Sequence, residues 1–110
     1  MACETGLSAI FVTCPSLDLS KSLGRRLIET KSAACCVTVI PQVISIYEWK
    51  EKIEEDTECL MIIKTQNSLL AEVIEFVKKN HPDDVVEIIT LPITGGSDVY
   101  LDCIKKATKK

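Results

Sequence analysis

A run of acidic side chains between residues 51 and 58 is the densest set of chemically useful groups in the chain. A hard cation is held by several carboxylate oxygens that converge on it, and paired carboxylates can act as general acid and base. Glu54, Glu55 and Asp56 converge in this way only if the chain folds all three inward. Because acids in a polar turn are usually solvated, we interpret the run as the tip of a hairpin rather than a catalytic or metal centre.

A thiol and an imidazole form a second candidate set. Cys14 ends an apolar segment and precedes Pro15, and His81, the only histidine, follows a predicted helix. Thiolate and imidazole suit copper or zinc, although such sites commonly use more protein ligands. The alternative is that Cys14 is a core residue and His81 caps a helix end, and the two interpretations stay open at this stage.

Three further residues carry groups that need a partner. Lys64 lies in the otherwise apolar segment IIKT, and a buried lysine requires a carboxylate or an anionic ligand. We favour a structural ion pair. Tyr47 and Trp49 could stack a flat ligand, but aromatic side chains of this kind more often pack in an oligomer interface.

Strands and helices that position these residues follow from the pattern of apolar side chains. The segment LSAIFVTC, residues 7–14, predicts a buried strand, and a second β-type run covers residues 33–50 with a bulge or edge position at Pro41. The polar EKIEED then leads to a strand over 57–65, so the two form a hairpin. Helical spacing predicts helices over residues 16–31, 67–80 and 97–110, and residues 85–93 are a fourth strand.

The helix starts carry capping residues: Ser16 or Asp18, then Asn67, then Ser97. The order β-α-β-β-α-β-α contains the ferredoxin-like split βαβ pattern in its first six elements. We therefore predict an α+β sandwich with a long β-hairpin, formed by a single domain over residues 1–110.

Composition excludes several classes of function. The net charge of −3 does not favour nucleic acid, no apolar run approaches the length of a membrane span, and no targeting segment is visible. We interpret the six cysteines as reduced thiols of a cytoplasmic protein. We also find no nucleophile–base pair, so no enzymatic activity is expected.

Several long stretches resemble one known family. FVTCPS, KSAACCVTVIPQVISIYEWKEKIEEDTECLMIIKT, NHP, EIITLPI and VYLDCI are similar, in collinear order from residue 7 to about 105, to the CutA family of divalent-cation tolerance proteins. Lys52 stands where we place the family's hairpin glycine. The resemblance implies a homotrimer of ferredoxin-like subunits whose long hairpin reaches a neighbouring subunit.

The same resemblance implies roles for the candidate residues. Cys14 and His81 become ligands of weakly bound copper or another divalent cation. Tyr47 and Trp49 become interface residues, and the acids lie at the rim of a subunit contact, where Glu55 or Asp56 could line an intersubunit pocket with Lys64. Two alternatives stay open: an effector-sensing trimer like the PII signalling proteins, and a trimeric scaffold for partner proteins.

Overall fold

The computed structural model describes residues 4–30, 33 and 36–108 of the chain. These residues form a four-stranded sheet, three α-helices and one short 3-10 helix. In chain order the elements are β1 (Leu7–Cys14), α1 (Leu17–Glu29), β2 (Val37–Trp49), β3 (Lys52–Gln66), η1 (Asn67–Leu69), α2 (Leu70–Asn80), β4 (Ile88–Ile93) and α3 (Asp98–Ala107). The strands lie in the order β2-β3-β1-β4, and all neighbours are antiparallel. The ferredoxin-like order predicted from the sequence is confirmed.

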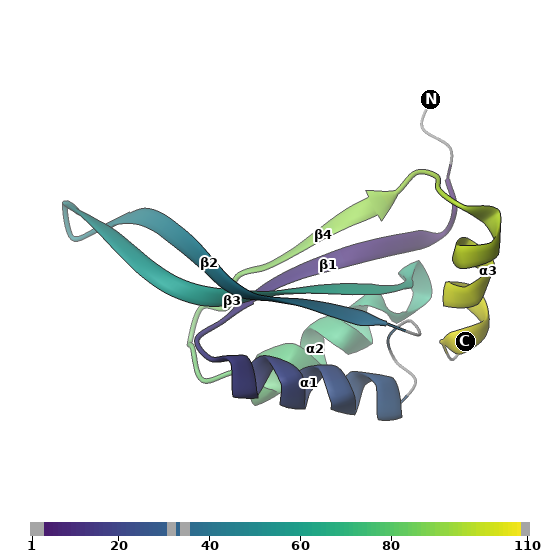
Figure 1. Ribbon diagram of the computed structural model, residues 1–110, viewed down its shortest axis with the longest axis horizontal. Coiled ribbons are helices and arrows are strands. Elements are labelled where there is room, and N and C mark those ends of the chain that lie inside the picture. The colour runs from purple at the N-terminus through teal and green to yellow at the C-terminus, as the bar shows by residue number, and fades with distance from the viewer. Residues whose placement is uncertain (1–3, 31–32, 34–35, 109–110) are drawn as a thin grey trace.

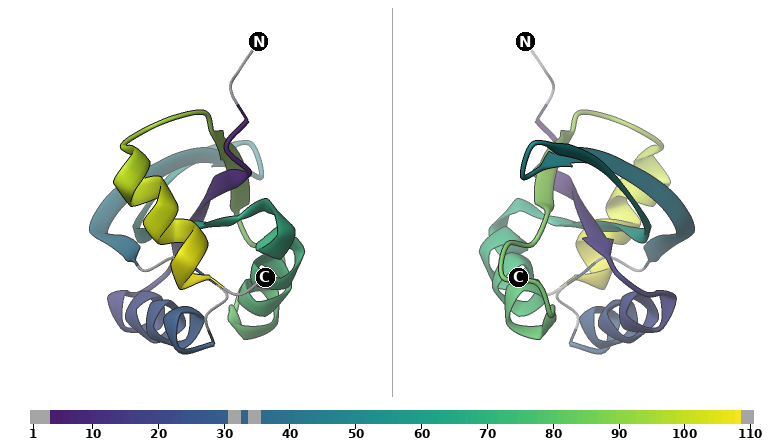
Figure 2. Two further views of the ribbon diagram at one scale, coloured as in Figure 1. Left: turned by 90° about the vertical axis from the view of Figure 1, so that its right-hand side faces the viewer. Right: turned by 90° about the vertical axis from the view of Figure 1, so that its left-hand side faces the viewer.

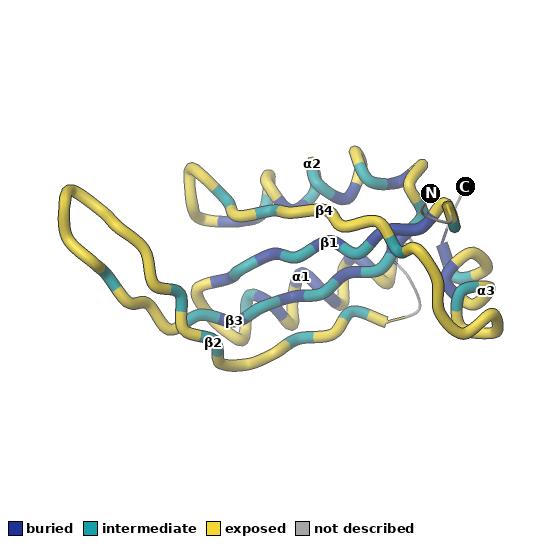
Figure 3. The backbone as a smooth tube through the Cα atoms, turned by 90° about the horizontal axis from the view of Figure 1, so that it is seen from above, coloured by how far each residue is buried: buried dark blue, intermediate teal, exposed yellow. Residues whose placement is uncertain are grey.

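Two helices cover one face of the sheet, and a third covers one end of the other face, where Ile104 packs on Leu7. α1 and α2 pack side by side beneath it, whereas α3 packs at one end, near the start of β1 (Figures 1 and 2). The core lies between the sheet and the two covering helices. It contains Ile10, Val12, Cys14, Leu23, Leu27, Met61, Ile63, Val73 and Val77. On the opposite, open face, α3 covers only the end at Leu7 and Ile93, and no other helix of the described residues lies over that face (Figure 3). No helix among the described residues is long and apolar enough to cross a membrane.

Serine caps start two of the helices. The Ser16 side chain accepts a hydrogen bond from Leu19 N at 3.2 Å at the start of α1, and Ser97 caps α3 in the same way. Asn67 does not cap α2, which corrects the prediction. Its backbone N–H donates to Gly6 O at 2.8 Å and its Oδ1 accepts from Ser8, so Asn67 ties η1 to the start of β1.

The hairpin of β2 and β3 is longer than predicted. β3 begins at Lys52, and the turn consists of Lys50 and Glu51 with φ angles of 50° and 66°, the backbone of a two-residue primed turn. The acids at 54–56 are therefore strand residues and not the hairpin tip. The start of β3 could not be predicted from the sequence because the outer hairpin lies beyond the helices (Figure 1). Its faces there are exposed, and no alternation of apolar and polar side chains marks the strand.

A bulge interrupts the pairing of the hairpin strands. The register shifts between Ile40 and Val43, and the Cys59 thiol donates to Pro41 O at 3.1 Å. This confirms the irregularity predicted at Pro41, which has no N–H to give to a ladder. Beyond the bulge, Tyr47 and the other odd-numbered residues of β2 lie on the open face.

The turn offers a direct test of backbone strain. An L-residue in the left-handed region costs about 1–2 kcal/mol more than glycine does, so Glu51→Gly should raise the free energy of unfolding by about 1 kcal/mol. Lys52 does not have a positive φ angle. A glycine is therefore expected to relieve strain at position 51 and not at position 52. Lys52→Gly is the matched control and should lower stability by about 0.5–1 kcal/mol. Urea unfolding at one protein concentration distinguishes the two, and equal midpoints would contradict the assignment of strain to Glu51.

Candidate functional site

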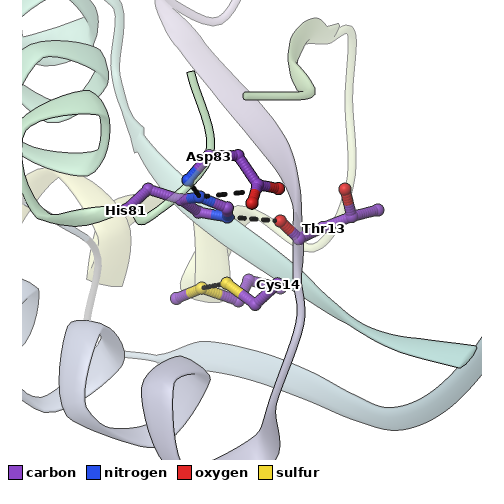
Figure 4. A network of polar contacts seen from close by, with 5 residues as sticks. Thr13, Cys14, His81 and Asp83 are labelled. Atoms are coloured by element: carbon purple, nitrogen blue, oxygen red, sulfur yellow. Dashed lines mark hydrogen bonds and ion pairs between the residues drawn. The ribbon is translucent and has the colours of Figure 1, made fainter. Parts of the chain in front are cut away.

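His81 lies at the C-terminal end of α2, with its side chain fully buried against the end of β1 (Figure 4). Its Nε2 lies 2.9 Å from Thr13 O, and its Nδ1 accepts a hydrogen bond from Asp83 N at 3.1 Å. A carbonyl can only accept and an amide can only donate, so these partners place the ring proton on Nε2. The neutral imidazole therefore joins α2, β1 and the loop after α2.

Cys14 is buried at the end of β1, facing the core. Its thiol donates to the Met61 sulfur at 3.6 Å. Burial raises the pKa of the Cys14 thiol, while a hydrogen bond with Ser20 opposes this increase. Since only the thiolate binds metals strongly, Cys14 in this state is a core residue with a protonated sulfur.

The structure brings His81 to Thr13, the residue before Cys14, although 68 positions separate them. In residues 4–30, 33 and 36–108, no cluster of three or more His, Cys, Asp or Glu side chains could hold a metal ion. Both ring nitrogens of His81 are engaged and the Cys14 thiol is protonated, so this arrangement does not fit a resident cation. Cation binding by this pair stays a prediction, and it requires the present hydrogen bonds to break.

The three neighbouring acids do not converge. Glu54 pairs with Tyr47, Glu55 with Ile46, and Asp56 with Ser45. Because side chains alternate along a strand, Glu55 points to the opposite face from Glu54 and Asp56. A cation cage built from all three is therefore not formed within one chain.

Asp56 has a partner on the hairpin itself. The Tyr47 hydroxyl donates to Asp56 Oδ2, and this hydrogen bond raises the pKa of Tyr47 to about 12. Because the pKa is raised above the unfolded value of 10.0, the contact stabilises the fold below pH 10. That contribution is lost as the pH rises from 10 to about 12.

This contact predicts a pH titration. In Asp56→Asn the neutral amide replaces the carboxylate, so the pKa of Tyr47 should fall from about 12 toward its ordinary value. Absorbance of tyrosinate reports the titration, with Tyr47→Phe identifying the signal of Tyr47. Glu55→Gln, on the other face, is the control and should leave the titration unchanged. An Asp56→Asn titration identical to that of the unsubstituted protein would contradict the contact.

Large apolar side chains cover the outer hairpin and the open face. Trp49 is 61% exposed, and Ile44, Ile46 and Ile53 are exposed on the other face of the hairpin. On the open face, Ile89 is 50% exposed and Leu91 is 43% exposed. Large exposed apolar side chains on both faces of the hairpin and on β4 favour an interaction role for these surfaces. The interface role of Tyr47 and Trp49 stays a prediction.

Lys64 lies half-buried on β3, next to Ala9 of β1. Its Nζ donates to Thr38 Oγ1 at 3.0 Å, and no carboxylate pairs with it within the part of the chain that the structure describes. Asp56 is eight positions away on the same strand, which is about 26 Å at the rise of an extended chain. A pocket that joins Lys64 to Glu55 or Asp56 therefore needs a second copy of the chain.

Comparison with known proteins gives matches over nearly the whole chain. The family model for CutA1 divalent ion tolerance proteins matches residues 8–107. The chain is 50% identical over 103 residues to Protein CutA of Mus musculus, covering 94% of this chain and 58% of that relative's length. The chain thus spans less than two thirds of the mouse protein.

Two solved structures agree in fold and sequence. The crystal structure of CutA1 from Oryza sativa superimposes with a TM-score of 0.90 and 42% identity, and covers 94% of each chain. The structure described as the periplasmic divalent cation tolerance protein CutA from Archaeoglobus fulgidus gives a TM-score of 0.87 and 35% identity, and covers 94% of this chain and 99% of that one. The likeness therefore extends from sequence to backbone.

Proposed function

Because this chain belongs to the CutA1 divalent ion tolerance family, we propose that it acts as a non-enzymatic homotrimer that binds copper or another divalent cation weakly. Family membership supports a role in metal tolerance. The observation that carries the proposal is the match over residues 8–107, which includes both Cys14 and His81. The mouse relative is longer than this chain, so its activity is attributed to this chain only as a proposal.

The trimer is supported by the apolar open face of the sheet. Ile40, Ile89 and Leu91 present exposed apolar side chains there, while the half-buried Lys64 has no carboxylate partner within the described part of the chain. Burial against another copy would remove the apolar surface from water. It would also give Lys64 access to acids on a neighbour's hairpin.

Cation binding is proposed at Cys14 and His81, with low affinity. A cation there must displace the Asp83 N–H from Nδ1 and the proton from the Cys14 sulfur. Metal binding that releases a proton strengthens as the pH rises, and the raised pKa of Cys14 keeps the affinity low at neutral pH. Two protein ligands are fewer than such sites commonly use, which also keeps the affinity low.

Equilibrium dialysis with Cu(II), Zn(II) and Cd(II) tests the cation proposal, and light scattering after size exclusion tests the trimer. Cys14→Ser and His81→Ala should each weaken cation binding about tenfold or more, with circular dichroism confirming that each variant is folded. Cys103→Ser, which removes an exposed thiol, is the matched control. Unchanged binding in the first two variants removes these residues as ligands, and a stable monomer contradicts the proposed assembly.

The cytoplasm is the proposed location. Cys14, Cys36, Cys59 and Cys103 are free thiols. Free thiols persist in reducing compartments such as the cytoplasm, which supports this location. The related protein from Archaeoglobus fulgidus is described as periplasmic. Fractionation of cells that express the native gene would decide between the two compartments.

A further inference from the structure

A groove of about 560 Å³ lies between α1 and the edge strand β2. It is separate from Cys14 and His81, and none of the residues proposed above as cation ligands lines it. A volume of this size is typical of small-molecule sites. The six lining residues that carry the argument are Lys21, Arg25, Ile28, Glu29, Val37 and Val39.

The floor of the groove is apolar and closely packed. α1 approaches β2 at Gly24, where an added Cβ would lie 3.4 Å from Val37 Cγ1. Val37 and Val39 are half-buried, and Ile28 is exposed at the side. An apolar ligand body placed here would cover these three side chains, and removing their apolar surface from water would favour binding.

The rim of the groove carries two cations. Lys21 and Arg25 are four positions apart on α1, so they lie on one face of the helix. Neither forms an ion pair in the ranges 4–30, 33 and 36–108. The adjacent Arg26 is different, since it donates to Asn80 Oδ1 at 3.1 Å and lies over the Phe76 ring. Arg26 joins α1 to α2, whereas Arg25 is available to a ligand.

We propose that this groove binds an organic monocarboxylate with a small apolar body. The planar guanidinium of Arg25 can donate two parallel hydrogen bonds to one carboxylate, and Lys21 adds a second positive charge. The apolar body lies against Val37, Val39 and Ile28. Glu29, one turn beyond Arg25, repels a second anionic group, which selects a single carboxylate and orients the ligand.

Four probes of one small series test the ligand chemistry on the full chain. Hexanoate has the head and the body, acetate has the head alone, hexanol has the body alone, and hexylamine reverses the charge. Titrations followed by shifts of backbone amide resonances should show hexanoate binding about tenfold more tightly than any of the other three. The shifts should fall on residues 21–29 and 36–39.

Charge-removing variants test the site. Lys21→Gln/Arg25→Gln should weaken hexanoate binding about tenfold while leaving hexanol binding unchanged. Lys78→Gln/Lys79→Gln removes the same charge from exposed positions on α2 and should change neither. All the substituted side chains are exposed, so the variants are expected to fold. The proposal is overturned if hexanoate causes no shifts, if hexanol or hexylamine binds equally well, if the shifts fall on Ile89 and Leu91 instead, or if the first variant binds hexanoate normally.

Discussion

An Ile89→Glu/Leu91→Glu variant is expected to be a monomer under conditions in which the unsubstituted chain is a trimer. Both side chains belong to β4 and pair with Phe11 and Ala9 of β1. They lie on the open face, because their neighbours Ile88 and Val12 face the core. Fully burying one large aliphatic side chain contributes about 1.5–3 kcal/mol. Two glutamates would forfeit that contribution and add the cost of desolvating two charges in each subunit.

The matched control places the same charges on apolar residues that lie off the strands. Val85 is 91% exposed and Val99 is 80% exposed, and they lie in the loop before β4 and in α3. Val85→Glu/Val99→Glu should therefore keep the mass of the trimer. Light scattering coupled to size exclusion measures the masses. A trimeric Ile89→Glu/Leu91→Glu variant would show that subunits meet through another surface, such as the hairpin alone.

Strands whose side chains are buried in the core could be predicted from the sequence more accurately than strands that are exposed. β1 occupies residues 7–14 as expected, because it is central in the sheet and alternate side chains enter the core. The predicted strand over 57–65 matched only the inner part of β3. The outer part, from Lys52 onward, lies beyond the helices (Figure 1), so its polar residues resemble a turn when read locally.

The sequence predicts which residue types form the candidate site, but it does not predict which residues contact one another there. The sequence predicts Cys14 at the end of a strand, and the alternative that it is a core residue agrees with its full burial. Its hydrogen bond to Met61 and the approach of His81 to Thr13 join residues that are 47 and 68 positions apart. Such pairings depend on strand order and on the length of α2, which no local pattern encodes.

The cations of α1 were missed for a related reason. Arg25 and Arg26 are neighbours in sequence and look equivalent there. The packing of α1 on α2 and β2 gives Arg26 a structural partner and directs Arg25 to the groove. The sequence did carry one usable signal, since Lys21 and Arg25 are one helical turn apart.

His81→Ala should lower the free energy of unfolding by about 3 kcal/mol, with or without a chelator present. Removal of the buried ring leaves a cavity next to β1. It also leaves Thr13 O and the Asp83 N–H without their present partners, and the loss of such a hydrogen bond costs about 0.5–1.5 kcal/mol. Urea unfolding in EDTA measures this loss. A loss that occurs only when a cation is present would instead indicate that His81 stabilises the fold through the ion.

The Asp83→Ala variant distinguishes the contribution of the imidazole ring to stability from that of the neighbouring carboxylate. The Asp83 carboxylate lies 3.9 Å from Nδ1 and is more than half exposed, while the hydrogen bond to the ring comes from the backbone N–H, which alanine retains. Exposed ion pairs contribute about 0–1 kcal/mol, so this variant should lose less than about 1 kcal/mol. If Asp83→Ala is as destabilised as His81→Ala, the Asp83 side chain, and not the hydrogen-bonded ring alone, accounts for the stability contributed by this site. A small loss in Asp83→Ala together with a large loss in His81→Ala assigns that contribution to the neutral imidazole.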